Sequence, residues 1–141
     1  MPTELEQIVK KYVPFVSVYH SNGFDEKCRI VLPQKIIWTL QRRQEVQEMD
    51  ELILYYRLHE VEIPKIELTD FFPMGEWFSF PEYNPLCIDK ISRILIPRKD
   101  LDKVSIPTQN SGKDSREVVF EGNGNKILIY RAEDYEKYVK P

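Results

Sequence analysis

The sequence has few of the residues on which metal and redox sites depend. Among 141 residues there are two cysteines and two histidines. Cys28 and Cys87 lie far apart and form no Cys-x-x-Cys motif, which argues against a disulfide framework. His20 and His59 stand alone, whereas zinc sites need clustered histidines or cysteines. We therefore expect neither a metal centre nor a cofactor.

Long hydrophobic runs are also missing from the chain. No apolar stretch approaches the roughly 20 residues that span a bilayer, and the first twelve residues, MPTELEQIVKKY, are charged with no apolar signal region. The expectation is a soluble cytoplasmic protein that does not contact a membrane. With five glycines and ten prolines, the sequence favours many short elements over a helical bundle. Its 42% hydrophobic content is enough for the core of a single domain, residues 1–141.

Charge is distributed unevenly along a chain whose net charge is −3. Residues 27–43 hold five bases and no acid, whereas residues 44–82 hold ten acids and two bases. Residues 90–99 again hold four bases and no acid. Two basic islands in an acidic chain can be ordinary fluctuation, so their meaning depends on a second observation.

That second observation is an internal repeat that coincides with both islands. Residues 25–35 read DEKCRIVLPQK, and residues 89–99 read DKISRILIPRK. At an offset of 64 they share five identities and two aliphatic matches in eleven positions. The common pattern is Asp, three variable residues, Arg-Ile, two aliphatic residues, Pro, one variable residue and Lys.

Each copy predicts a strand, an Asp-led turn, a second strand and a helix. Asp25 and Asp89 can accept backbone N–H bonds at the start of the turn. The aliphatic residues after each arginine suit a buried strand, and Pro33 and Pro97 can begin a helix. Two such units packed together would close a small β-barrel about a pseudo-two-fold axis and present two matched Asp–Arg turns. Alternatively, the Asp–Arg pairs serve only to stabilise the turns.

Periodicity predicts the remaining elements, so the fold class expected is mainly β with short helices (α+β). The best hairpin surrounds the GNGN run near the C-terminus. The predicted helices are 4–12, 34–49 and 132–139, and the extended segments are 15–19, 52–56, 78–80, 86–88, 117–121 and 126–130. Segment 61–82 is expected to hold short strands and loops, and 104–116 to be a loop after Ile106.

The repeat resembles a known family. The segments DKISRILIPRKDL and REVVFEGNGNKILIYRAEDYEKY are similar to the C-terminal half of MraZ proteins, and GFDEKCRIVLPQKI matches the first half. MraZ proteins belong to the AbrB/MraZ swapped-hairpin superfamily, which has a D-x-x-x-R turn in each half. The resemblance covers residues 15–40 and 78–139. It implies a double swapped-hairpin β-barrel, with halves at 13–50 and 76–139, a ring-like homo-oligomer and transcriptional control of bacterial division and cell-wall genes.

The chain departs from that family at three places. The family commonly has glycine before the turn arginine, where this sequence has Cys28 and Ser92. If that position needs a positive φ, both copies carry a conformational cost. About 14 residues precede the first strand, and the acidic segment 44–82 matches poorly.

The resemblance and the basic islands together predict a site for double-stranded DNA in the nucleoid. The family's turn arginines face DNA, which carries over to Arg29 and Arg93, with Asp25 and Asp89 structuring the turns. Basic side chains around the turns would bind phosphates and fix the register. These expected phosphate contacts are Lys27, Lys35, Lys90, Arg98 and Lys99.

Two other functions are alternatives to DNA binding. A degenerate barrel could act as a protein-interaction module through the acidic segment 44–82, although its aromatic residues (Phe71, Phe72, Trp77, Phe78 and Phe80) suit a core better than an exposed anchor. An enzyme is disfavoured because the carboxylate pairs Asp25/Glu26 and Asp100/Asp102 suit turns and helix starts. The chain also lacks a phosphate-cradling glycine loop, and we expect no small-molecule ligand.

Overall fold

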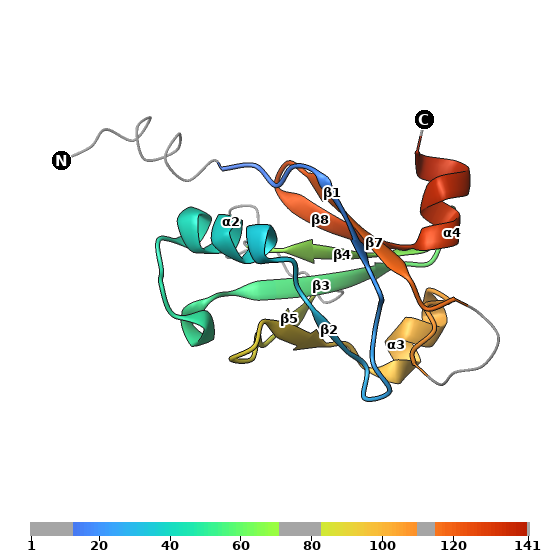
Figure 1. The fold of residues 1–141 in the computed structure, drawn as a ribbon, viewed down its shortest axis with the longest axis horizontal. Coiled ribbons are helices and arrows are strands. Elements are labelled where there is room, and N and C mark those ends of the chain that lie inside the picture. Colours follow the sequence, from blue (N-terminus) through green and yellow to red (C-terminus); the bar gives the residue numbers. More distant parts are fainter. Residues whose placement is uncertain (1–12, 71–82, 110–114, 141) are drawn as a thin grey trace.

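The computed structural model describes residues 13–70, 83–109 and 115–140 (Figure 1). It is mainly β with short helices, which confirms the α+β class expected from the sequence. All its named strand pairs are antiparallel and form one six-stranded sheet and one separate two-stranded ribbon. In order across the large sheet, the strands are β1 (Val18–Ser21), β7 (Val118–Asn123), β8 (Lys126–Arg131), β4 (Lys65–Thr69), β3 (Leu54–His59) and β5 (Asn84–Leu86).

The ribbon consists of β2 (Arg29–Val31) and β6 (Arg93–Leu95). Each ribbon strand leads into a helix, α2 (Gln34–Gln44) or α3 (Arg98–Lys103), and a proline stands at the N-cap of both. Because proline already holds φ near −65°, Pro33 and Pro97, both at φ −54°, set the direction in which the helix starts. The predicted strand–turn–strand–helix unit is therefore present twice.

Element order shows that the symmetry extends beyond the repeated eleven residues. The first half runs β1-β2-α2-β3-β4 and the second half runs β5-β6-α3-β7-β8. If each strand of the large sheet is exchanged for its counterpart, the order β1-β7-β8-β4-β3-β5 becomes the same order reversed. A pseudo-two-fold axis therefore passes between β4 and β8. It also crosses the ribbon, where Ile30 lies opposite Ile94, its own equivalent in the repeat.

The hairpin β3–β4 is the counterpart of β7–β8, although it falls in the segment 44–82 that matched poorly in sequence. Strands β3 and β7 begin 64 residues apart, as the repeat does, but β4 and β8 begin 61 residues apart. The connection between β3 and β4 is five residues long, whereas Gly124 and Asn125 alone connect β7 to β8. This three-residue difference breaks the constant offset, so the second hairpin strand escapes an ungapped comparison.

The core lies between the large sheet and the layer formed by the ribbon and helices (Figure 1). Ile30 and Ile94 point into it from the ribbon, and Ile37 and Leu101 from the helices. A fully buried aliphatic side chain contributes about 1.5–3 kcal/mol. A smaller cluster around Tyr135 covers part of the other sheet face.

Several element boundaries differ from the sequence prediction. Helix α2 ends at Gln44 rather than at residue 49, because Glu45 adopts a left-handed conformation (φ 57°). The Gln44 side chain then bonds the backbone N–H and C=O of Ile53, where the chain has doubled back. Strand β3 begins at Leu54, two residues later than predicted.

The predicted C-terminal helix is confirmed as α4 (Ala132–Asp134) followed by a π-helical turn (Tyr135–Val139). The predicted helix 4–12 and extended segment 78–80 lie outside the described residues. Within the described ranges, no helix is long and apolar enough to cross a membrane.

Candidate nucleic-acid interface

The first repeated turn is organised by one carboxylate. Asp25 Oδ1 accepts hydrogen bonds from the backbone N–H groups of Lys27 and Arg29, each at 2.9 Å. Its Oδ2 lies 3.0 Å from both Nε and Nη2 of the Arg29 guanidinium. The backbone closes the turn through the Cys28 N–H, which donates to the Asp25 carbonyl. Asp25 therefore fixes both the path of the chain and the position of the guanidinium.

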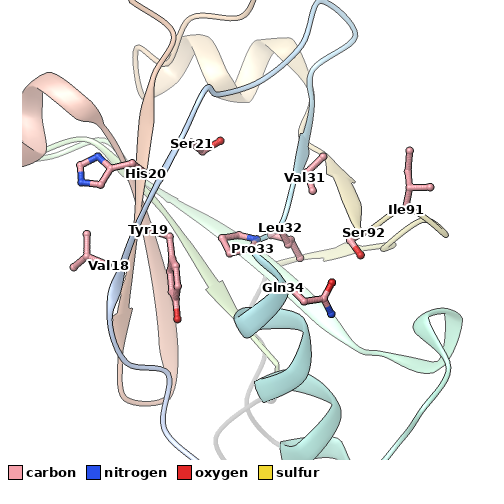
Figure 2. Close-up of a pocket in the computed structure, with 10 residues that line it drawn as sticks. All are labelled: Val18, Tyr19, His20, Ser21, Val31, Leu32, Pro33, Gln34, Ile91 and Ser92. Carbon is pink, nitrogen blue, oxygen red and sulfur yellow. The ribbon is translucent and has the colours of Figure 1, made fainter.

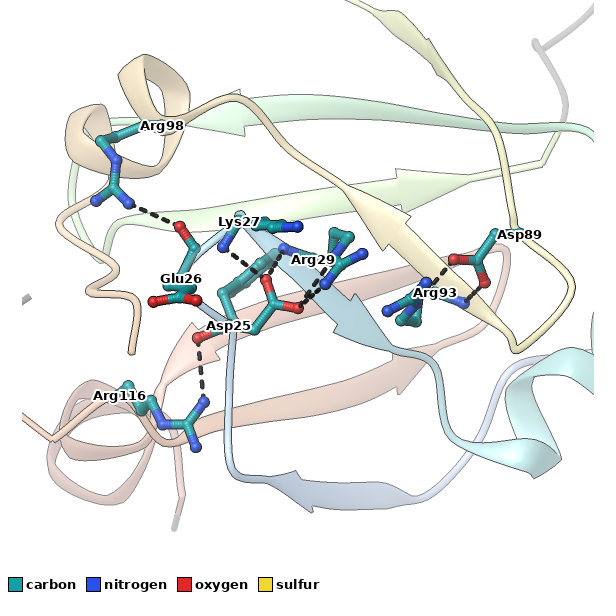
Figure 3. A network of polar contacts seen from close by, with 9 residues as sticks. Asp25, Glu26, Lys27, Arg29, Asp89, Arg93, Arg98 and Arg116 are labelled. Atoms are coloured by element: carbon teal, nitrogen blue, oxygen red, sulfur yellow. Dashed lines mark hydrogen bonds and ion pairs between the residues drawn. The ribbon is translucent and has the colours of Figure 1, made fainter. Parts of the chain in front are cut away.

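The second turn repeats this arrangement. Asp89 Oδ1 accepts from the N–H groups of Ile91 and Arg93 at 3.0 and 2.8 Å, and Oδ2 lies 2.7 Å from Arg93 Nε (Figure 3). The Ser92 N–H donates to the Asp89 carbonyl. The Asp–Arg pairs thus stabilise the turns, as the alternative interpretation required. They also hold two arginines in a fixed pose.

The residue before each arginine has a positive φ, 64° at Cys28 and 65° at Ser92. The left-handed conformation costs roughly 1–2 kcal/mol in a residue with a side chain. The ribbon holds it in place, because the Cys28 carbonyl accepts from the Ile96 N–H and the Ser92 carbonyl accepts from the Leu32 N–H. Both copies therefore carry the expected conformational cost, which a glycine at this position would avoid.

The register of the ribbon places both arginines on its outer face. Arg29 lies opposite Leu95, and Val31 lies opposite Arg93. Because side chains alternate along a strand and the central isoleucines face the core, these four side chains face outward. The arginines are diagonal neighbours, a relation that places residues about 7–8 Å apart. Their side chains are 30% and 26% exposed, so they are neither sequestered nor on unrelated faces.

Both turn aspartates are held in the ionised form. Partial burial raises the pKa of Asp25, but hydrogen bonds from Arg29 and from the Lys27 amide outweigh it and leave the pKa below its ordinary value of 3.8. At Asp89, the bonds donated by the backbone and side chain of Arg93 lower the pKa. Each guanidinium thus keeps a charged partner at neutral pH, and the contacts still leave it N–H donors for a ligand.

The remaining predicted phosphate contacts divide into two groups. Arg98 is exposed at the start of α3, but it donates to the Thr108 hydroxyl at 3.1 Å and to the Glu26 carbonyl at 3.2 Å (Figure 3). It therefore links the second helix to the first turn, a role that the sequence did not reveal. The other four predicted contacts are exposed lysines around the turns and helix starts: Lys27, Lys35, Lys90 and Lys99.

One arginine of the first basic island is buried. Arg43 makes a two-pronged ion pair with Asp70, at 2.7 and 3.0 Å, and donates to the Val13 carbonyl at 2.6 Å. Both side chains of the pair are 2% exposed. Arg43 thus connects α2 to the end of β4 and adds nothing to the surface potential.

Two of the carboxylates considered for catalysis have structural partners: Asp25 organises the first turn, and Asp100 is hydrogen-bonded in the core. Asp100 is buried and accepts a 2.6 Å hydrogen bond from the Tyr56 hydroxyl, where burial and this bond raise the pKa of Tyr56. His59 lies 2.9 Å from Glu67, which also accepts from the Tyr83 hydroxyl. No group of three metal-ligating side chains occurs within the described segments. The aromatic residues between 71 and 80 lie outside them.

An open groove of about 610 Å³ lies beside the ribbon, between β1 and the second turn (Figure 2). It is lined by Tyr19 of β1, by Val31 and Pro33 of the first half, and by Ile91 of the second turn. The imidazole of His20 points away from the ribbon in this view (Figure 2). The groove contains no cluster of charged side chains, so it lacks the chemistry of a site for a charged small molecule.

Comparison with protein families and with curated proteins identifies no match. No protein-family model matches the chain, and none of the curated proteins matches it. The geometry of the ribbon and its two turns is therefore the basis on which a function can be argued.

Proposed function

We propose that this chain binds double-stranded DNA as a transcriptional regulator of the MraZ kind. The observation that carries the proposal is the ribbon register, which presents Arg29 and Arg93 on one outer face. Each arginine is held by an ion pair with the aspartate of its own turn. A two-stranded ribbon is narrow enough for the major groove of DNA. Arginines whose pose is fixed in advance lose little rotamer freedom on binding.

The same proposal assigns the fold to the double swapped-hairpin class. Support comes from the way the halves interleave: β1 of the first half pairs with β7 of the second, and β5 of the second pairs with β3 of the first. Each half therefore completes the sheet of the other. The two D-x-x-x-R turns then flank the axis that relates the halves.

The exposed lysines beside the turns, Lys27, Lys35, Lys90 and Lys99, would bind phosphates and set the register on DNA. One chain offers few such contacts, so its own affinity is weak. A homo-oligomer, ring-like as in the resembled family, would bind several DNA elements at once and raise the effective concentration of each turn. The protein would then lie on the nucleoid.

The proposal is tested by removing both turn arginines. Arg29→Ala with Arg93→Ala should abolish retention of DNA fragments recovered by a pull-down from genomic DNA, measured by gel shift. Lys137→Ala with Lys140→Ala is the matched control, because it removes the same charge from two exposed lysines at the C-terminal end of the chain. Undiminished affinity of the arginine variant would reject the proposal, and so would an equal loss in the control.

A protein-interaction module is the second candidate, and the exposed aliphatic side chains Val31, Leu95 and Ile91 favour it. The acidic segment 44–82 supports it less, because Glu67 and Asp70 are buried and already paired. Salt separates the two candidates. DNA affinity falls steeply with salt through counterion release, whereas an apolar protein contact does not.

A further inference from the structure

The outer face of the ribbon carries two aliphatic side chains as well as two arginines. Val31 is 55% exposed and Leu95 is 51% exposed. We propose that these two side chains contact the 5-methyl groups of thymines, and so make the ribbon specific for thymine next to the bases that the arginines contact. This inference rests on the proposed DNA binding and adds a sequence preference to it.

The position of the two residues follows from the register. Leu95 is directly opposite Arg29, and Val31 is directly opposite Arg93. Opposite residues in an antiparallel pair have β-carbons about 4.5–5.5 Å apart. The rise between stacked bases along one strand is about 3.4 Å. An arginine and its opposite aliphatic residue can therefore reach neighbouring base pairs of one groove.

The chemistry of the four side chains matches the edges of base pairs in the major groove. Arginine pairs with O6 and N7 of guanine, and the thymine methyl is the apolar group that a base pair displays there. Val31 and Leu95 occupy the place where a purely phosphate-binding ribbon would carry polar or basic residues. The two repeat segments that carry them, residues 25–35 and 89–99, hold seven bases and three acids, a net charge of +4, which makes a polyanion the complementary partner.

The pseudo-two-fold axis predicts how the preferred bases are arranged on the DNA. Because Ile30 lies opposite Ile94, the axis relates Arg29 to Arg93 and Val31 to Leu95. The chain should therefore select two guanine–thymine elements in inverted orientation, with unequal weight because valine and leucine differ in size.

The test uses thymine and deoxyuridine, which differ only by that methyl group. A pool of duplexes with 20 random base pairs is enriched on the immobilised full-length protein, and the enriched duplex is then synthesised with either base. We expect the uracil duplex to bind about fifteenfold more weakly, since burying one methyl-sized group is worth roughly a fourfold change in affinity and two such groups are lost.

Variants then assign the effect to the ribbon. Val31→Ser with Leu95→Ser should bind both duplexes with the affinity that the natural protein has for the uracil duplex. Val61→Ser, at a 79% exposed valine in the β3–β4 connection, is the control and should keep the discrimination. Circular dichroism melting establishes that each variant is folded.

The outcomes distinguish this inference from the function on which it rests. Equal binding of both duplexes by the natural protein, or discrimination that persists in the double variant, overturns the thymine contact and leaves DNA binding intact. Failure to enrich any duplex from the pool overturns both.

Discussion

The two halves of the chain build the same turn but differ in its exposed residues. The aspartate–arginine bonds, the left-handed residue and the cross-ribbon hydrogen bonds agree between the copies to within a few tenths of an ångström and one degree of φ. The solvent-facing positions have diverged: Glu26 corresponds to Lys90, and Lys27 to Ile91. The aspartate and arginine of each turn are therefore shared, whereas the exposed positions between them are not.

The divergence gives the halves different electrostatics. Residues 25–35 contain two acids and three bases, whereas residues 89–99 contain one acid and four bases. The net charges are therefore +1 and +3. At the proposed DNA site the two half-sites would thus be unequal, and the second half would attract phosphate more strongly.

The largest effect is expected from breaking the buried ion pair between Arg43 and Asp70 in the first half. Arg43→Met should destabilise the protein by about 3–5 kcal/mol, because it leaves Asp70 charged and unpaired in a buried site. The midpoint of urea unfolding measures the loss. In the second half, Lys103 lies 3.9 Å from Asp100 and is 52% exposed, so Lys103→Ala should change stability by less than about 0.5 kcal/mol. Equal effects would contradict the difference between the helices.

Single arginine substitutions should sharpen the electrostatic comparison. Arg29→Ala and Arg93→Ala should each weaken DNA binding by about tenfold or more, in line with one lost bidentate base contact. The loss should be greater for Arg93, since its half-site carries more positive charge. Gel shifts at two salt concentrations measure both. A larger loss for Arg29 would show that the charge difference does not set the relative affinity.

Glycine substitutions at the two left-handed positions should change the stability of the protein by different amounts. Ser92→Gly should stabilise the protein by about 0.5–1 kcal/mol, because relief of the strained φ exceeds the entropy that glycine loses on folding. Cys28→Gly should be close to neutral, since the buried Cys28 side chain also loses its packing. Urea unfolding provides the measurement. A stabilised Cys28→Gly alone would reverse the expected order.

The smallest effect is a dependence on acid. The folded-state pKa values of Asp25 and Asp89 lie below the ordinary value of 3.8. Their contribution to stability is therefore complete above about pH 4 and is lost as the pH falls through the lower folded values. The urea midpoint of the natural protein should decline below pH 4. Asp25→Asn with Asp89→Asn should lower the midpoint at pH 7 and flatten that decline, and an unchanged slope would assign it to other carboxylates.

Much of the turn could be predicted from the sequence, because its chemistry is local. An aspartate four residues before an arginine, an aliphatic strand and a proline each act on neighbouring residues, and the pattern occurs twice. The C-terminal hairpin was predictable for the same reason, since Gly124 supplies the positive φ that its two-residue turn needs.

The parts that escaped prediction depend on contacts between distant segments. Charge along the sequence does not say which way a side chain points, so nothing marked Arg43 as buried or Arg98 as a tether. The end of α2 is set by the bond between Gln44 and Ile53, which forms only once the chain has returned. An ungapped sequence comparison misses the equivalence of the two hairpins, because the β3–β4 connection is three residues longer than the β7–β8 connection.

The interleaved sheet also decides how the molecule can be divided. Among the strands of the described residues, β1 pairs in the large sheet with β7 alone, and β5 pairs with β3 alone. A gene cut after Asp70 would therefore not release two small independent proteins. It would yield two fragments with unpaired sheet edges, and each fragment would complete its sheet only by pairing with the other.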